Sequence, residues 1–175
     1  MIAINLMNAA NFATLLRILC IPFIGWALHV DQYIIAFSLF LFAALSDIFD
    51  GWYARKYNCE SNFGRLFDPI ADKVLLSTVL IFLLASPSSD LSAILCALLL
   101  AREFIASGLR SFLSTENVVL PAGSMGKIKT IVQFVALAMC LLNWETGIYL
   151  LWLSVALSYY GLGQYLLLST QKMRP

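Results

Sequence analysis

The sequence is poor in charged residues and in the residue types that usually bind transition metals. Only 12% of its 175 residues are charged, whereas soluble domains carry about 25%. It has one histidine, His29, and four cysteines without C-x-x-C spacing, so a zinc site is not expected. In contrast, 61% of the residues are hydrophobic and the mean hydropathy is +0.86. These values exclude an ordinary soluble domain and indicate an integral membrane protein, for which no nucleic-acid partner is expected.

Six apolar segments each approach the ~20 residues that a helix needs to cross a bilayer. The sequence therefore predicts an all-α fold, a single membrane domain over residues 1–175 with six transmembrane helices. Residues 1–12 favour a short amphipathic helix along the interface, and no cleavable signal peptide is predicted. The six segments cover residues 13–30, 33–55, 67–86, 91–112, 126–143 and 147–168.

The charges are distributed unequally between the two sides of this predicted bundle. The connections after the first, third and fifth segments contain Asp31, Asp90 and Glu145 but neither lysine nor arginine. All eleven basic residues lie at or toward the other side. By the positive-inside rule, that side and both termini are cytoplasmic.

Four aspartates lie within 26 residues of this apolar chain. An aspartate at the centre of a membrane helix costs roughly 2.5 to 3.5 kcal/mol, so a compensating partner is expected. Helical spacing groups the aspartates with small residues, at i, i+3, i+4 and i+7 in the first half and at i, i+4 and i+8 in the second. The two groups are Asp47, Asp50, Gly51 and Ala54, and then Gly64, Asp68 and Asp72.

The connection between the two groups predicts that their helices face each other. Residues 56–62 are polar and turn-prone, and Pro69 favours a second helix that begins near Asp68. Four converging carboxylates suit Mg²⁺ or Mn²⁺, and two such ions can hold a pyrophosphate and stabilise its attacking and leaving oxygens. The alternatives are helix caps with ion pairs at the membrane edge, or a cation path through a transporter.

The spacing D-x-x-D-G-x-x-A-R-x8-G-x-x-x-D-x-x-x-D, from Asp47 to Asp72, resembles the signature of the CDP-alcohol phosphotransferase family. The resemblance implies a membrane enzyme that transfers a phosphatidyl or similar group from a CDP-activated donor to an alcohol and releases CMP. It also implies two Mg²⁺ or Mn²⁺ ions on Asp47, Asp50, Asp68 and Asp72, with Asp72 as the catalytic base. Gly51, Ala54, Arg55 and Gly64 would then bind the donor nucleotide.

Asn11, Thr14 and Arg17 repeat at three-residue spacing where the first segment begins. One interpretation is a helix cap with an arginine that extends to the lipid head groups. Members of the resembled family often carry a similar element beside the nucleotide site. That resemblance makes Asn11 and Arg17 further candidates for binding the donor nucleotide.

A second polar group, within residues 102–110 and 126–130, contains several cations on the same predicted side as the aspartates. It can anchor the helices to anionic lipid, or form a pocket for an acceptor that carries a phosphate. In a regular helix Lys127 and Lys129 would point about 200° apart, so they converge only if that helix starts late or one side chain bends round. The candidate acceptor-phosphate residues are Arg102, Ser107, Arg110, Lys127 and Lys129.

The patterns Arg-Glu-x-x-x-Ser-x-Leu-Arg and Gly-Lys-x-Lys-Thr, within the same ranges, are similar to those of the phosphatidylglycerophosphate synthase branch of the family. This resemblance implies CDP-diacylglycerol and glycerol 3-phosphate as substrates, in a bacterial inner membrane, with the active site facing the cytoplasm. A cardiolipin synthase or a phosphatidylinositol-phosphate synthase are the alternatives within the family. Gly161-x-Gly163 in the last segment favours packing against a second copy, so a homodimer is an open alternative to a monomer.

Overall fold

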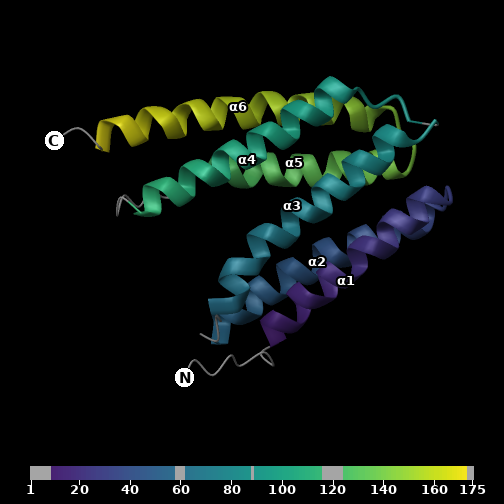
Figure 1. The fold of residues 1–175 in the computed structure, drawn as a ribbon, viewed down its shortest axis with the longest axis horizontal. Helices are drawn as coiled ribbons and strands as arrows, with labels where there is room; N and C mark the ends of the chain where they lie inside the picture. Colours follow the sequence, from purple (N-terminus) through teal and green to yellow (C-terminus); the bar gives the residue numbers. More distant parts are fainter. Residues whose placement is uncertain (1–8, 58–61, 88, 116–123, 173–175) are drawn as a thin grey trace. The chain divides into compact units, whose positions relative to one another are not determined.

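Helices are the only regular secondary structure in the described part of the chain. The computed structural model describes residues 9–57, 62–87, 89–115 and 124–172, with backbone only for 9–13, 47–57, 62–66, 124–127, 168 and 170–172. These residues form six α-helices and no strand, which confirms the predicted all-α fold (Figure 1). The helices are α1 (Ala9–His29), α2 (Tyr33–Tyr57), α3 (Asn62–Ala85), α4 (Ala93–Thr115), α5 (Ser124–Leu141) and α6 (Thr146–Lys172).

Each helix matches one of the six apolar segments, although charges interrupt most of them. Within the described residues, one stretch, Thr146–Leu167, is both long and apolar enough to span a membrane. Three shorter apolar stretches occur at Thr14–His29, Tyr33–Ser46 and Ile128–Leu141. The predicted interfacial helix falls mostly on residues 1–8, outside the described residues.

The start of α3 differs from the prediction based on Pro69. The helix begins at Asn62 rather than near Asp68, and Pro69 lies inside it. Proline at this position removes one hydrogen bond, to the carbonyl four residues earlier, and the rest of the helix can compensate. Pro22 lies inside α1 in the same way. Proline was therefore the wrong indicator of the helix boundary here.

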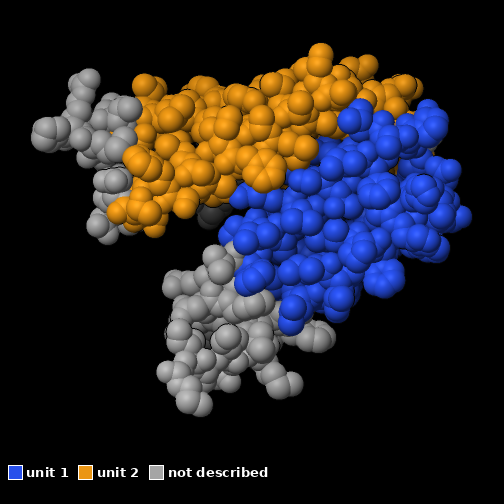
Figure 2. Space-filling model, in the orientation of Figure 1, with its two compact units in different colours: residues 1–88 blue, residues 89–175 orange. Residues whose placement is uncertain are grey.

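The chain divides into two compact units, Met1–Ser88 and Ser89–Pro175 (Figure 2). In the first unit, α1 packs against both α2 and α3. The residues that meet show that α1 and α3 run parallel, since Thr14 contacts Asp68 near their starts and Gly25 faces the Phe82 ring near their ends. Parallel packing brings the beginning of α1 alongside the aspartates of α3.

The second helix of this unit runs antiparallel to the third. The Tyr33 hydroxyl, at the beginning of α2, is hydrogen-bonded to Ser86 Oγ, just after the end of α3. Four residues, 58–61, separate the other ends of these helices. The two halves of the aspartate motif therefore lie toward the ends of α2 and α3 that residues 58–61 connect, and the prediction that these two ends face each other stays a prediction.

In the second unit, α6 packs against both α4 and α5. The α5–α6 connection is short, and Asn143 adopts a left-handed conformation with φ of 55°. The next amide, Trp144 N–H, donates to the carbonyl of Met139 at 3.0 Å, which caps the end of α5. Asp31 has the same conformation after α1, with φ of 56°. Both positions carry Asp or Asn, the non-glycine residues that tolerate this conformation best.

Candidate active site

The first half of the aspartate motif lies on the last turns of α2. The helix continues to Tyr57, so Asp47, Asp50, Gly51 and Ala54 belong to one uninterrupted helical face. Their side chains, and that of Arg55, lie outside the described residues. Whether the two α2 carboxylates approach those of α3 therefore stays a prediction.

The second half of the motif lies on the first turns of α3. Gly64, Asp68 and Asp72 follow one another at four-residue spacing within the continuous helix, as predicted. The side chains of Asp68 and Asp72 are partly buried, and that of Asp72 is 43% exposed. Two carboxylates from successive turns therefore share one side of α3.

Side chains from α1 contact both of these aspartates. The Thr14 hydroxyl donates a hydrogen bond to Oδ1 of Asp68. Arg17 Nη1 donates to Oδ1 of Asp72 at 2.8 Å, and this contact is also an ion pair. Thr14 and Arg17 are separated by three residues, as Asp68 and Asp72 are by four, so the parallel helices α1 and α3 bring the two pairs into register.

The Arg17–Asp72 pair is buried on the arginine side and open on the aspartate side. The arginine side chain is only 2% exposed. A fixed guanidinium restricts the orientation of the carboxylate. Asp72 is thus a preoriented anion that a ligand can still reach, which suits either a metal ligand or a base.

A second polar cluster joins the helices of the second unit. Glu103 Oε1, on α4, accepts hydrogen bonds from Arg102 Nη1 at 2.9 Å and from Lys129 Nζ of α5. Arg102 Nε also donates to the backbone carbonyl of Ser158 on α6, at 3.2 Å. Arg102 and Lys129 are each about 5% exposed, so this cluster is nearly removed from solvent.

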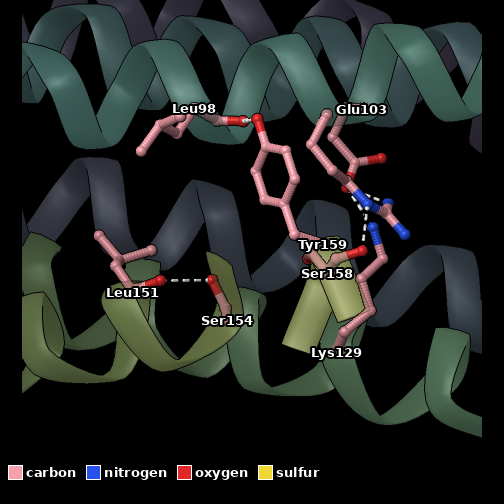
Figure 3. Close-up of polar contacts among 8 residues, drawn as sticks. Leu98, Glu103, Lys129, Leu151, Ser154, Ser158 and Tyr159 are labelled. Atoms are coloured by element: carbon pink, nitrogen blue, oxygen red, sulfur yellow. Dashed lines mark hydrogen bonds and ion pairs between the residues drawn. The ribbon is translucent and has the colours of Figure 1, made fainter. Parts of the chain in front are cut away.

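Figure 3 shows the Lys129 side chain directed toward the Glu103 carboxylate, and the Tyr159 hydroxyl directed toward the carbonyl of Leu98. The tyrosine bond, at 3.2 Å, joins α6 to α4 one turn before the charged residues. The Tyr159–Leu98 and Arg102–Ser158 hydrogen bonds therefore both join α6 to α4.

The remaining acceptor candidates are distributed around this cluster. Ser107 and Arg110 lie on the Glu103 side of α4, at i+4 and i+7, with Ser107 partly buried and Arg110 exposed. Lys127 and Lys129 both belong to α5, which begins at Ser124. A late helix start therefore does not bring the two lysines together, and the side chain of Lys127 lies outside the described residues.

Comparison with known proteins identifies the chain. The family model described as CDP-alcohol phosphatidyltransferase matches residues 7–160. The chain belongs to the CDP-alcohol phosphatidyltransferase family. It is therefore an enzyme of a membrane-associated family, with transferase activity in phospholipid synthesis.

Several curated bacterial members of this family are similar to the chain. A Rickettsia felis protein named CDP-diacylglycerol–glycerol-3-phosphate 3-phosphatidyltransferase is 42% identical over 139 residues, 78% of this chain and 76% of the relative. A Bacillus subtilis protein of the same name is 42% identical over 106 residues, 60% of this chain and 53% of the relative. A Mycobacterium tuberculosis protein named "Probable phosphatidylglycerophosphate synthase" is 38% identical over 141 residues, 77% of this chain and 66% of the relative.

The CDP-alcohol phosphatidyltransferases generally use divalent metal ions. Among the described side chains, no three Asp, Glu, His or Cys residues lie close enough together to hold a metal ion. The side chains of Asp47 and Asp50 are outside the described set. The donor set on α3 fits Mg²⁺ or Mn²⁺, because Asp68 and Asp72 supply carboxylate oxygens from successive turns. A carboxylate has about four lone-pair sites, so a hydrogen bond from Thr14 or Arg17 leaves capacity for a metal ion.

Two residues of these sites were not among the predicted functional residues. Thr14 was recognised only as part of the Asn11–Arg17 repeat, yet its hydroxyl contacts Asp68 directly. Glu103 was noticed only as a charge on an apolar helix, yet it accepts bonds from two of the predicted acceptor residues. The signal for Thr14 was its position three residues before Arg17. The signal for Glu103 was a carboxylate adjacent to an arginine in an otherwise apolar stretch.

Proposed function

We propose that this enzyme transfers the phosphatidyl group of CDP-diacylglycerol to glycerol 3-phosphate, with phosphatidylglycerophosphate and CMP as products. The structural observation that supports the transferase chemistry is the arrangement of Asp68 and Asp72, which lie on one side of α3 and are each held by a side chain of α1. The names of relatives with 42% identity support this donor and this acceptor.

The four aspartates would hold the divalent ions of the reaction. Asp47 and Asp50 would provide ligands from α2, and Asp68 and Asp72 from α3. Such ions would neutralise negative charge on the donor pyrophosphate and on the departing nucleotide. Thr14 would fix the orientation of the Asp68 carboxylate, so that its other lone pairs point in a constant direction.

Asp72 would accept the proton of the acceptor alcohol. The hydroxyl oxygen attacks the β-phosphorus, the bond from that phosphorus to the bridging oxygen breaks, and CMP leaves with the bond electrons. The hydroxyl proton passes to the Asp72 carboxylate. A carboxylate is a weak base, so its effectiveness would come from position rather than from basicity.

The donor nucleotide would lie along the α2 face. Gly51 and Ala54 have almost no side chain, so the cytidine or ribose can approach the helix closely. Arg55 would contact the pyrophosphate, and Gly64 would leave room at the beginning of α3. Asn11 would complete this site from α1. Arg17, on the same helix, donates its hydrogen bond to Asp72.

The acceptor phosphate would bind in the second polar group. Lys129 of α5 and Arg110 of α4 would contact this phosphate, and Lys127 is the third candidate. Arg102 and Ser107 would orient them. Because Lys129 is held at Glu103, its charge has a fixed location, which favours a compact phosphate over a diffuse lipid surface.

A panel of acceptors tests this assignment. The purified enzyme is supplied with CDP-diacylglycerol and Mn²⁺, and separately with glycerol 3-phosphate, inositol phosphate, phosphatidylglycerol or serine. We expect a lipid product and an equal amount of CMP with glycerol 3-phosphate only. A product from inositol phosphate or phosphatidylglycerol, with none from glycerol 3-phosphate, would assign the enzyme to another branch of the family.

We also infer a multi-pass arrangement in the bacterial inner membrane, with six spans, both termini cytoplasmic and the aspartates facing the cytoplasm. Six helices of 18 to 27 residues support this arrangement, and the asymmetry of the basic residues supports the orientation. Reporter fusions to each terminus test this topology. A reporter that works only in the cytoplasm should be active at both termini, and a reporter that works only outside the cytoplasm should be inactive at both.

A homodimer is a further proposal. Cβ atoms added at Gly161 or Gly163 would meet nothing within 4 Å, so α6 has a bare surface at these two positions. Small residues let a second helix approach closely in a membrane. Replacement of both glycines by leucine should convert a dimer in detergent to a monomer, as measured by light scattering.

A further inference from the structure

The cluster formed by Arg102, Glu103 and Lys129, here called the Glu103 cluster, has an unusual charge arrangement. One oxygen atom, Glu103 Oε1, accepts hydrogen bonds from both cations. The Arg102 guanidinium and the Lys129 ammonium are therefore both within hydrogen-bond distance of the same oxygen atom. The three side chains have a net charge of +1, whereas a structural ion pair would be neutral.

The carboxylate is what makes this geometry possible. Two cations so close together repel each other, and in a poorly solvated site this repulsion is strong. Long basic side chains are also flexible and tend to extend toward water. Without the Glu103 carboxylate we expect Lys129 to turn away from Arg102, because only the carboxylate joins them among the described contacts.

The cluster is also anchored to the third helix of its unit. Arg102 Nε donates to the carbonyl of Ser158, so the guanidinium is fixed from two directions. Lys129 has Glu103 as its ion-pair partner. The position of the Lys129 ammonium therefore depends on Glu103, which in turn is held by the anchored arginine.

We propose that Glu103 is a positioning residue for the acceptor. It holds Arg102 and Lys129 together so that they present one uncompensated positive charge, at a fixed place, to the phosphate of the acceptor. Glu103 acts through these cations and does not itself contact the phosphate. This inference rests on the proposed function, in which Lys129 and Arg102 belong to the acceptor site.

A double-mutant cycle in the full-length enzyme tests the proposal. The variants are Glu103→Gln, Lys129→Met and the double variant, each assayed with glycerol 3-phosphate and CDP-diacylglycerol varied separately. For Glu103→Gln we expect KM for glycerol 3-phosphate to rise about tenfold, equal to about 1.4 kcal/mol. We expect kcat and KM for CDP-diacylglycerol to change by less than about twofold. The reason is that the substitution weakens binding of glycerol 3-phosphate equally in the ground state and the transition state. The increase in the double variant should be well below the product of the two single increases, because the residues act together.

Gln133→Leu is the matched control. Gln133 lies one turn beyond Lys129 on α5, is equally buried, and its amide nitrogen makes no hydrogen bond within the described residues. The substitution changes buried polarity on the same helix without changing the cluster, so both KM values should stay unchanged. If the Glu103→Gln protein does not fold, Glu103→Asp replaces it, with a smaller increase in the same KM expected.

Four results would overturn the proposal: an unchanged KM for glycerol 3-phosphate in the Glu103 variant, equal increases in both KM values, independent effects in the double variant, or the same shift in the Gln133 control. Failure of the proposed function looks different. In that case the wild-type enzyme itself makes no lipid from glycerol 3-phosphate.

Discussion

Arg17 and Asp72 form an ion pair at 2.8 Å between α1 and α3, with the arginine buried and the aspartate 43% exposed. Because of this difference in exposure, the two side chains have different roles. The arginine is committed to the protein interior, where its charge needs a partner, while the carboxylate keeps one side open to a ligand. The parallel packing of α1 and α3 thus connects the beginning of the first helix to the last aspartate of the motif.

Replacement of Arg17 tests whether this pair serves catalysis. Arg17→Gln removes the charge that holds Asp72, and we expect kcat to fall by about 100-fold, as expected for a misplaced catalytic group. Arg17→Lys keeps the charge without the planar fork, so an intermediate kcat is expected. Steady-state CMP release measures both variants. His29→Gln, at the exposed end of α1, is the control, and wild-type kcat in Arg17→Gln would contradict the account.

Replacement of Thr14 tests the support of Asp68. Thr14→Val keeps the shape of the side chain and removes the hydroxyl that donates to the carboxylate. Hydrogen bonds to charged groups contribute about 1.5 to 3 kcal/mol, so we expect the Mn²⁺ concentration for half-maximal activity to rise at least about tenfold. Titration of activity with Mn²⁺ measures this. Thr14→Ser should restore the wild-type value, and an unchanged metal requirement in the valine variant would exclude this role.

Removal of divalent metal ions tests the carboxylate site as a whole. We expect a chelator such as EDTA to abolish CMP release, and added Mg²⁺ or Mn²⁺ to restore it, because four carboxylates without cations are costly in a membrane protein. Circular dichroism before and after chelation shows whether the helices persist. Full activity in a preparation free of divalent ions would exclude a metal-dependent reaction.

The helices were predictable from the sequence because apolar length is a strong signal. The expected segments 33–55 and 147–168 correspond to α2 and α6 within a few residues. The face shared by Gly64, Asp68 and Asp72 was also predictable, since it follows from helical spacing alone. Pro69 misled the prediction because sequence reasoning treats proline as a helix start, and here the helix continues through it.

The partners of the polar residues were less predictable, because they depend on which helices pack together. Sequence spacing cannot show that α1 and α3 run in parallel register, and so it did not pair Arg17 with Asp72. In the same way, Lys129 was predicted to point at a phosphate, and its contact with Glu103 depends on the packing of both α4 and α5 against α6.

Gly147 provides a test of packing in the second unit. A Cβ at this position would lie 2.8 Å from the backbone nitrogen of Cys140 and 2.9 Å from the carbonyl oxygen of Ala136, and backbone atoms cannot move aside easily. Gly147→Ala should therefore destabilise the protein by about 1 to 3 kcal/mol. The thermal unfolding midpoint in detergent measures this loss. Gly108→Ala is the control because its Cβ would meet nothing within 4 Å, and equal midpoints for the two variants would contradict the packing described.

The most direct test of the central claim is CMP release by Asp72→Asn with saturating CDP-diacylglycerol, glycerol 3-phosphate and Mn²⁺. Asparagine has nearly the same shape but cannot accept the proton of the acceptor hydroxyl. Our account predicts that turnover is lost while binding of CDP-diacylglycerol, measured by calorimetry, is largely retained. An Asp72→Asn enzyme that releases CMP at the wild-type rate would contradict it.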